Sequence, residues 1–168
     1  MNREPKEIGW RRDWPVIPYI FGVIIGFVVS VYDFWKIQHL NFQLSTFIII
    51  GIILLVIGGS LRIISRVTLT KAGFNIVNSY KLQIVKNHQL ITGGIYSHIR
   101  HPLYLGEMSR NIGFALILSS FYGTILMIIA DIFLLFRIEI EEKMLIDEFG
   151  HEYEKYKSKT KKFLPYVY

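Results

Sequence analysis

The sequence predicts an all-α membrane protein, a polytopic transmembrane bundle of about four spans with a C-terminal amphipathic interfacial helix. Of its 168 residues, 52% are hydrophobic and only 19% are charged, against roughly 25% charged in an ordinary soluble domain. Long uncharged stretches alternate with short basic ones, and the mean hydropathy is +0.37. These numbers exclude a disordered chain. The sequence contains no cysteine, which excludes disulfides and thiolate metal sites.

The first two spans are predicted over residues 15–33 and 41–63. Neither residues 14–32 nor residues 40–61 include an Asp, Glu, Lys or Arg. At about 1.5 Å per residue, each stretch is long enough to cross a hydrocarbon core of about 30 Å. Basic residues precede the first stretch, but no small-residue cleavage site follows it, so we expect a retained helix rather than a signal peptide.

The third apolar region admits two interpretations, because residues 111–130 are uncharged and residues 132–136 continue the stretch past Asp131. Either one tilted helix crosses the membrane, or two shorter helices reverse around residues 119–123. Basic residues concentrate on the cytoplasmic side of membrane proteins. Two helices place every basic segment except Lys36 on one side, whereas one helix would require the basic tail to be translocated. Two helices are therefore favoured.

The predicted organisation is a single membrane domain over residues 1–168, multi-pass, with both termini cytoplasmic. Its last two spans cover residues 102–119 and 121–138, a cytosolic loop covers residues 64–101, and an amphipathic helix covers residues 139–159. Within the loop, residues 82–85 have a strand-like pattern. This topology accounts for the net charge of +6, so no nucleic-acid partner is expected.

Ionisable residues in or beside the spans are candidates for function, because such groups are costly in lipid. They are Arg100, His101, Glu107, Arg110, Asp131, Arg137, Glu141 and Glu142. Simple structural roles exist for several of them. Arg100 and His101 suit an interfacial anchor ahead of a helix that Pro102 begins. The remaining residues suggest ion pairs inside or between the helices.

The spacing of these residues predicts specific pairs. Glu107 and Arg110 are three apart on one helical face and are expected to pair, and Asp131 is expected to face Arg110 or a water-filled cavity. Arg137 and Glu141, four apart, could form an intrahelical ion pair. Adjacent Glu141 and Glu142 at a membrane edge are better explained if they face a cation. The five histidines lack a metal-binding spacing, so no metal is expected.

Two blocks in the second half of the chain carry a family resemblance. They comprise Tyr96, Arg100-His101-Pro102, Tyr104 and Gly106, then an apolar hairpin, then Arg137, Glu141-Glu142, Leu145, Phe149-Gly150, Tyr153, Tyr156 and Leu164-Pro165. In this order, from about His88 to Pro165, the chain resembles the isoprenylcysteine carboxyl methyltransferase family. The first two spans match only as apolar helices, and the additional spans of longer members are missing here.

The resemblance implies a membrane-integral methyltransferase that uses S-adenosylmethionine, with a lipid-like substrate that arrives from the bilayer. Carried over by position, the cofactor site would comprise His88, Gln89, Leu90, Ile91, Tyr96, His101, Pro102, Leu103, Tyr104, Glu141 and Glu142. Arg137 would orient the substrate. The chemistry agrees, because a sulfonium cation needs carboxylate and aromatic surroundings, and a guanidinium can hold a carboxylate through two hydrogen bonds.

The leading functional hypothesis is methylation of an oxygen, in a carboxylate or in an enol or hydroxyl, on the polar head of a lipid-like molecule. The alternatives are N-methylation of a phospholipid amine, a nicotinamide-dependent reduction of the sterol type, and a non-enzymatic membrane scaffold. The expected partners are the lipid-like substrate and the surrounding membrane lipids.

Overall fold

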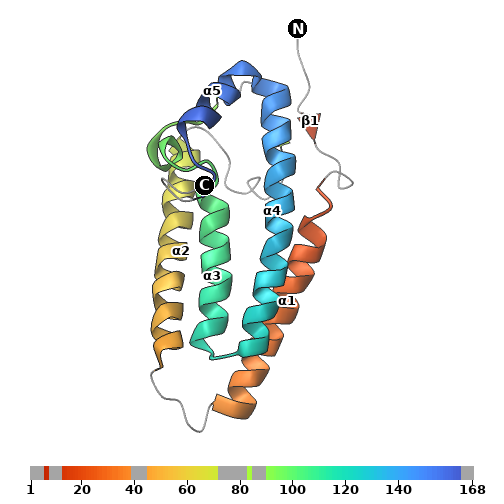
Figure 1. Ribbon diagram of the computed structural model, residues 1–168, viewed down its shortest axis with the longest axis vertical. Coiled ribbons are helices and arrows are strands. Elements are labelled where there is room, and N and C mark those ends of the chain that lie inside the picture. The colour runs from red at the N-terminus through yellow and green to blue at the C-terminus, as the bar shows by residue number, and fades with distance from the viewer. Residues whose placement is uncertain (1–5, 8–12, 39–44, 72–82, 85–89, 164–168) are drawn as a thin grey trace.

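The predicted all-α class is confirmed by a computed structural model, which describes residues 6–7, 13–38, 45–71, 83–84 and 90–163 (Figure 1). The helices are α1 (Val16–Asp33) with a π-helical extension η1 (Phe34–Gln38), α2 (Thr46–Lys71), the short 3-10 helix η3 (Gly94–Ser97), α3 (Pro102–Ile117), α4 (Phe121–Phe149) and α5 (His151–Lys159). Two residue pairs, β1 (Lys6–Glu7) and β2 (Gln83–Ile84), form a short antiparallel ladder. The ladder overlaps the strand-like stretch predicted at residues 82–85.

The four long helices run alternately up and down, and the hairpin between α3 and α4 has the predicted reversal (Figure 1). Its turn places Ser119 at a positive φ of 52°. Ser120 then caps α4, because its hydroxyl accepts a hydrogen bond of 2.9 Å from the backbone N–H of Gly123. The hairpin therefore brings the start of α3 and the far end of α4 to the same end of the bundle.

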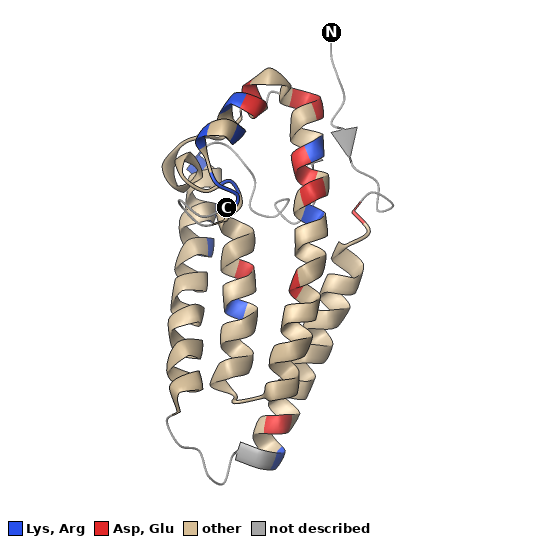
Figure 2. Cartoon of the chain, in the orientation of Figure 1, with Lys and Arg blue, Asp and Glu red and all other residues tan. Residues whose placement is uncertain are grey.

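The outer surface of the bundle is apolar, as the surface of a multi-pass membrane protein must be. Among the described residues, three helical segments are long and apolar enough to cross a membrane, Val16–Lys36, Thr46–Lys71 and Phe121–Phe149. Large side chains such as Phe21, Val56 and Phe121 are 63%, 60% and 72% exposed. Charged residues gather instead at the end of the bundle where α4 meets α5 (Figure 2).

Helices α2 and α3 form one tight pair, because glycines on both helices face each other. A Cβ atom on Gly58 would lie 2.6 Å from the carbonyl oxygen of Gly106, and one on Gly113 would lie 2.8 Å from that of Gly51. These separations leave no room for a side chain, so the two backbones touch at two places about two turns apart. Small residues at such interfaces allow the close packing on which helix association in membranes depends.

Helices α1 and α4 form the second pair in the same way. A Cβ atom on Gly22 would lie 2.8 Å from the Cβ of Ala130, and one on Gly26 would lie 3.2 Å from the sulfur of Met127. Ala130 is fully buried and Met127 is 2% exposed. The bundle thus consists of two closely packed helix pairs rather than four equivalent helices.

A network of hydrogen bonds and ion pairs connects the two pairs inside the apolar region. Glu107 of α3 pairs with Arg110 one turn along, as predicted, and also with Arg62 of α2. The hydroxyl of Tyr19 on α1 donates to Glu107 Oε1 at 3.1 Å. One carboxylate therefore pairs with two cations and accepts a hydrogen bond from a phenol, with groups from three helices, in a region where an isolated charge would be costly.

Asp131 joins this network through a residue that the sequence analysis did not single out. Asn111 donates from Nδ2 to Asp131 Oδ1 at 2.9 Å and to the Tyr19 hydroxyl at 3.1 Å. The hydrogen-bond partner of Asp131 Oδ1 is thus the carboxamide of Asn111, which the prediction of Arg110 or a water-filled cavity did not include. Asn111 links α1, α3 and α4 with one side chain.

Two helix boundaries differ from the prediction. Helix α2 ends at Lys71 rather than residue 63, because the polar residues Ser65, Thr68 and Thr70 hydrogen-bond the carbonyls four residues back and do not interrupt the helix. The predicted start at residue 41 lies in a stretch outside the described residues, and the helix is observed from Thr46.

The predicted interfacial helix over residues 139–159 is also not one helix. Helix α4 continues to Phe149 and breaks at Gly150, whose φ is 50°. Such a left-handed residue is a common helix terminator and is easily adopted by glycine. Helix α5 then turns back over the end of the bundle (Figure 1), which brings the basic tail toward the start of α3.

The close packing of α2 and α3 predicts that Gly58→Ala destabilises the bundle, whereas Gly59→Ala does not. A Cβ at Gly58 would meet backbone atoms within 2.8 Å, while nothing lies within 4 Å of a Cβ at Gly59. Because overpacking typically costs 1–3 kcal/mol, we expect Gly58→Ala to lower the free energy of unfolding in mixed micelles by about 2 kcal/mol. Equal unfolding curves for the two variants would contradict this account of the pair.

Candidate active site

The segment that begins α3 is held in place by the tail of the chain. The backbone N–H of Arg100 donates to the carbonyl of Lys161 at 2.8 Å, and that of His101 donates to the carbonyl of Lys162 at 3.2 Å. Pro102 occupies the first helical position, where its missing N–H is not needed. These contacts close the end of the bundle that carries most of the charge.

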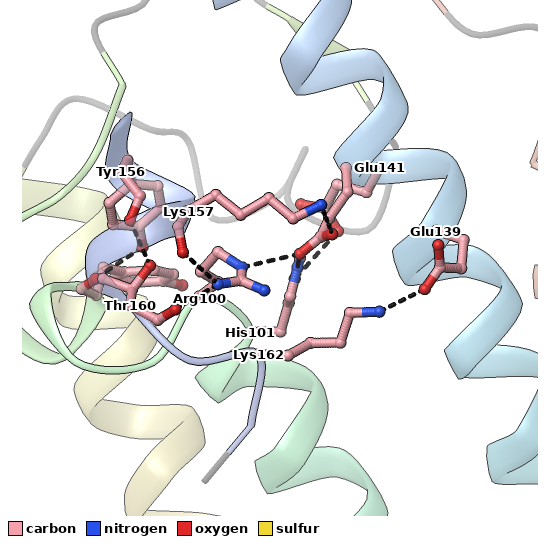
Figure 3. A network of polar contacts seen from close by, with 10 residues as sticks. Arg100, His101, Glu139, Glu141, Tyr156, Lys157, Thr160 and Lys162 are labelled. Atoms are coloured by element: carbon pink, nitrogen blue, oxygen red, sulfur yellow. Dashed lines mark hydrogen bonds and ion pairs between the residues drawn. The ribbon is translucent and has the colours of Figure 1, made fainter. Parts of the chain in front are cut away.

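The carboxylate of Glu142 on α4 is the centre of this region, and Figure 3 shows Arg100, His101 and Lys157, which contact it. Its Oε1 lies 2.9 Å from Nε of Arg100 and 3.1 Å from Nε2 of His101, and its Oε2 lies 3.2 Å from Nζ of Lys157. The Glu142 side chain is only 5% exposed. Both oxygens are therefore occupied by groups of the chain itself, and the cations that Glu142 faces in this structure are Arg100 and Lys157.

Arg100 extends the same network to the end of α5. Its Nη1 donates to the carbonyls of Lys157, at 3.1 Å, and of Thr160. The Thr160 hydroxyl in turn donates to the carbonyl of Tyr156 at 2.8 Å. One guanidinium thus joins α3, α4 and α5, which fixes the fold of the tail over the site.

Glu141, the residue before Glu142, has a carboxylate with fewer partners. Its Oε2 is buried and accepts no hydrogen bond within the described part of the chain. Nδ1 of His101 is 3.9 Å from this oxygen, and the Glu141 side chain is 26% exposed. A buried carboxylate oxygen without a hydrogen-bond donor is costly. Glu141 is therefore suited to bind a positively charged or hydrogen-bonding group.

Aromatic rings surround these carboxylates. The ring of Tyr104 contacts the ring of His101 edge to face, with centroids 5.8 Å apart. The rings of Tyr153 and Tyr156 on α5 lie 5.9 Å apart. Tyr153 is 1% exposed, and its hydroxyl has no hydrogen-bond partner among the residues that the structure describes. Aromatic faces of this kind favour an organic cation.

The tyrosines outside the spans are held in their neutral form. Burial raises the pKa of Tyr156 to about 12, and its hydroxyl donates to the carbonyl of Tyr96 at 2.7 Å. Burial also raises the pKa of Tyr96, and the nearby charge of Glu141 raises it further. Burial and the charge of Glu142 raise the pKa of Tyr153. At neutral pH these side chains therefore contribute hydroxyl groups and ring faces rather than anions.

Arg137 does not form the intrahelical ion pair with Glu141 that its spacing allowed. Instead Nε and Nη2 each donate to one oxygen of Asp13 at 2.8 Å, which is a bidentate ion pair between the start of α1 and α4. Both residues are 8% exposed. The guanidinium carbon also lies 6.0 Å from the centre of the Tyr104 ring. A partner 124 residues away thus replaces the local one.

The remaining predicted site residues fall into three groups. Pro102 is buried at the start of α3, and Leu103 is half-buried beside it. Leu90 and Ile91 are half-buried just ahead of η3. His88 and Gln89 lie outside the described residues.

The sequence analysis missed three residues of this region, Asp13, Lys157 and Thr160. Asp13 carried a recognisable signal, because it is an acidic residue at the edge of one uncharged stretch while Arg137 stands at the edge of another. Opposite charges at two span ends on the same side of a membrane are able to pair. Lys157 and Thr160 carried no comparable signal, since polar residues are common in a solvent-facing tail.

Comparison with known proteins agrees with the sequence blocks. The model of the isoprenylcysteine carboxyl methyltransferase (ICMT) family matches residues 48–147. The protein-S-isoprenylcysteine O-methyltransferase of Schizosaccharomyces pombe is 32% identical over 129 residues, which are 76% of this chain and 53% of that protein. The protein of the same name from Saccharomyces cerevisiae is 31% identical over 147 residues, 86% of this chain and 60% of the relative.

A solved structure shares the fold. The eukaryotic intramembrane Ras methyltransferase ICMT superposes with a TM-score of 0.67 and 26% identity, over 89% of this chain and 52% of that one. The present chain therefore spans about half the length of the relatives it matches.

The central position of Glu142 predicts that Glu142→Gln is strongly destabilising. The substitution keeps the shape of the side chain but leaves Arg100 and Lys157 without their common counter-charge. Removing one partner of a buried ion pair costs about 3–5 kcal/mol, so we expect the free energy of unfolding to fall by about 3 kcal/mol. Glu139→Gln is the control, because Glu139 is 56% exposed and pairs with Lys162 at the surface. Similar stability losses in both variants would contradict a special role for Glu142.

Proposed function

Because the chain belongs to the isoprenylcysteine carboxyl methyltransferase family, we propose that it methylates an oxygen on the polar head of a lipid-like acceptor. The methyl donor in this proposal is S-adenosylmethionine. The acceptor class suggested by the names of the relatives is a prenylated cysteine carboxylate. The observation that carries the proposal is the unpaired buried oxygen of Glu141, close to aromatic rings and to Arg137.

The residues around Glu141 fit the donor in charge and shape. S-adenosylmethionine, when bound, supplies a methyl group on a sulfonium cation, together with an ammonium group and hydroxyls. Glu141 Oε2 and the Tyr153 hydroxyl are buried polar atoms that lack hydrogen-bond partners in the described chain. We assign Glu141 to a positive group or a hydroxyl of the donor, and the rings of Tyr96, Tyr104 and Tyr153 to its faces. His101 keeps Tyr104 in place through their edge-to-face contact.

Glu142 has a different role in this proposal from Glu141. Its two oxygens already bind Arg100, His101 and Lys157. We therefore regard Glu142 as a positioning residue that holds the segment around His101, rather than as a direct ligand of the donor. The distinction follows from one helical step, because residues 141 and 142 point in directions about 100° apart on an α-helix.

Methyl transfer to a carboxylate requires little acid–base chemistry from the protein. The acceptor oxygen is already ionised, so it forms its bond to the methyl carbon as the carbon–sulfur bond breaks, and no proton moves. The rate then depends on alignment and on the exclusion of water. Arg137 is suited to align the acceptor, since a planar guanidinium holds a carboxylate in a defined orientation.

The proposed placement in the membrane puts this site at the cytosolic interface. We propose that α3 crosses as a fourth span, paired along its length with α2, and that both termini are cytoplasmic. Support comes from the charged residues, which gather at the end of the bundle where α4 meets α5 (Figure 2). The donor would then arrive from the cytosol and the acceptor from the bilayer.

The proposal predicts that Glu141→Gln weakens binding of S-adenosylhomocysteine by at least about tenfold while the fold stays intact. The charge that would pair with the ligand's ammonium group is lost, and a charge-assisted hydrogen bond is worth about 1.5–3 kcal/mol. Isothermal titration of the detergent-solubilised protein measures the affinity, and Glu139→Gln serves as the exposed neighbour. Unchanged binding in Glu141→Gln would remove the central observation and favour a non-enzymatic scaffold.

The product identifies the chemistry. Transfer of a labelled methyl group to an S-farnesylcysteine derivative should yield a methyl ester that mild base hydrolyses. A base-stable product would indicate an ether or a methylated amine instead. Binding of NADPH in place of S-adenosylhomocysteine would indicate the reductase alternative.

A further inference from the structure

Helix α2 carries an arginine whose charge is not compensated. Arg66 is half-buried, and its Nε is buried without a hydrogen-bond acceptor in the described part of the chain. Its guanidinium forms no ion pair with any residue that the structure describes. Arginine stays protonated in proteins, and a buried donor on a charged group is costly when it lacks an acceptor. Arg66 is therefore suited to bind an anion.

The charges around Arg66 leave a positive excess. Arg66 lies one helical turn beyond Arg62 on α2, and the charges of Arg66 and Arg110 both act on Arg62. Glu107 already pairs with Arg62 and Arg110. Asp131 lies near the charge of Arg110 but forms no ion pair within the described residues. An anion at Arg66 would offset this excess, whereas a further cation would be repelled.

Arg66 lies at the boundary between the apolar and the polar part of the bundle. A Cβ atom on Gly106 would lie 3.2 Å from the backbone nitrogen of Arg62, so these two residues are level. Helices α2 and α3 run in opposite directions (Figure 1). One turn further along α2, Arg66 is therefore level with Pro102, the first residue of α3. In the proposed placement of the bundle, lipid headgroups meet the acyl chains at this level.

The neighbours of Arg66 favour a lipid over a soluble anion. Ile63 and Val67 are 66% and 47% exposed, and they share one side of the helix with Arg66 because they lie three residues before it and one after. A phospholipid offers a phosphate to the guanidinium and acyl chains to the exposed apolar side chains. Basic pockets between transmembrane helices on the cytoplasmic side suit anionic headgroups, and the positive excess disfavours a headgroup that carries its own cation.

We propose that Arg66 is the centre of a binding site for the phosphate of an anionic glycerophospholipid, on the outer side of the α2–α3 pair. The phosphate would accept a hydrogen bond from the guanidinium, and an acyl chain would lie along Ile63 and Val67. The inference goes beyond methyl transfer, because no residue assigned to the donor or the acceptor takes part. A lipid that binds only the folded state also stabilises that state.

The test measures lipid binding to the full-length protein in dodecylmaltoside micelles. The probes are dioleoyl-phosphatidylglycerol and dioleoyl-phosphatidylcholine, and native mass spectrometry counts the bound lipid during each titration. We expect Arg66→Gln to weaken binding of the first phosphatidylglycerol at least about tenfold, because the charge-assisted hydrogen bonds are lost. Binding of phosphatidylcholine should stay within a factor of about two.

Lys71→Gln is the matched control. Lys71 is exposed at the end of the same helix, so the substitution removes the same charge without touching the proposed site. Its affinity for phosphatidylglycerol should stay within a factor of about two of wild type. Equal affinities in wild type and Arg66→Gln would overturn the inference. An equal loss in Lys71→Gln would also overturn it, since only diffuse attraction between charges would remain.

Two measurements on wild type complete the test, and they do not require Arg66→Gln to fold. Phosphatidylglycerol should bind at least about tenfold more tightly than phosphatidylcholine, and equal affinities would contradict the proposed site. Glycerol 3-phosphate in excess should not displace bound phosphatidylglycerol, because it lacks the acyl chains. Displacement would replace the lipid by a soluble phosphate compound and so overturn the inference as stated.

Discussion

The ion network around Glu142 is the constraint on which the candidate site depends. One carboxylate compensates Arg100 and Lys157 and contacts His101, and so connects the beginning of α3, the end of α4 that precedes α5, and the last helix. The local backbone alone would not hold these three segments together, since the tail contacts the start of α3 through only a short run of hydrogen bonds. With Glu142 in place, Glu141 is fixed one residue away with a buried oxygen that has no donor.

The bundle beneath the site consists of two closely packed helix pairs, with a polar interface between the pairs. Glycine contacts bring α2 to α3 and α1 to α4 at backbone distance, whereas the contacts between the pairs include the hydrogen bonds of Tyr19 and Asn111. Close packing is difficult to change by small amounts, while hydrogen bonds between membrane helices contribute modestly, about 0.6 kcal/mol on average. The interface between the two pairs is therefore the weaker one, whereas the ion pair of Asp13 and Arg137 lies within the α1–α4 pair.

Features that depend on nearby residues were predictable from the sequence, and those that depend on distant partners were not. Long stretches without charged residues predicted the apolar helices, and the i, i+3 spacing predicted the ion pair of Glu107 and Arg110. Spacing also suggested an ion pair between Arg137 and Glu141. Arg137 pairs with Asp13 instead, because two hydrogen bonds to one carboxylate are more favourable than the weak i, i+4 pair of an arginine that precedes a glutamate on one helix. The end of α4 at Gly150 was not predicted, because a single glycine within an otherwise helical pattern is compatible with continuation.

The two adjacent glutamates show why a motif alone does not assign roles. Their sequence context is nearly the same, and a cation is the natural partner of both. Helical geometry separates them by about 100°, so Glu142 turns toward the basic groups of the tail while Glu141 turns toward Tyr96 and Tyr104, whose surroundings include its charge. A carboxylate that is fully compensated by its own chain stabilises the fold, and one that is not remains available to a ligand. The division between structural and binding carboxylates therefore follows from charge compensation in three dimensions.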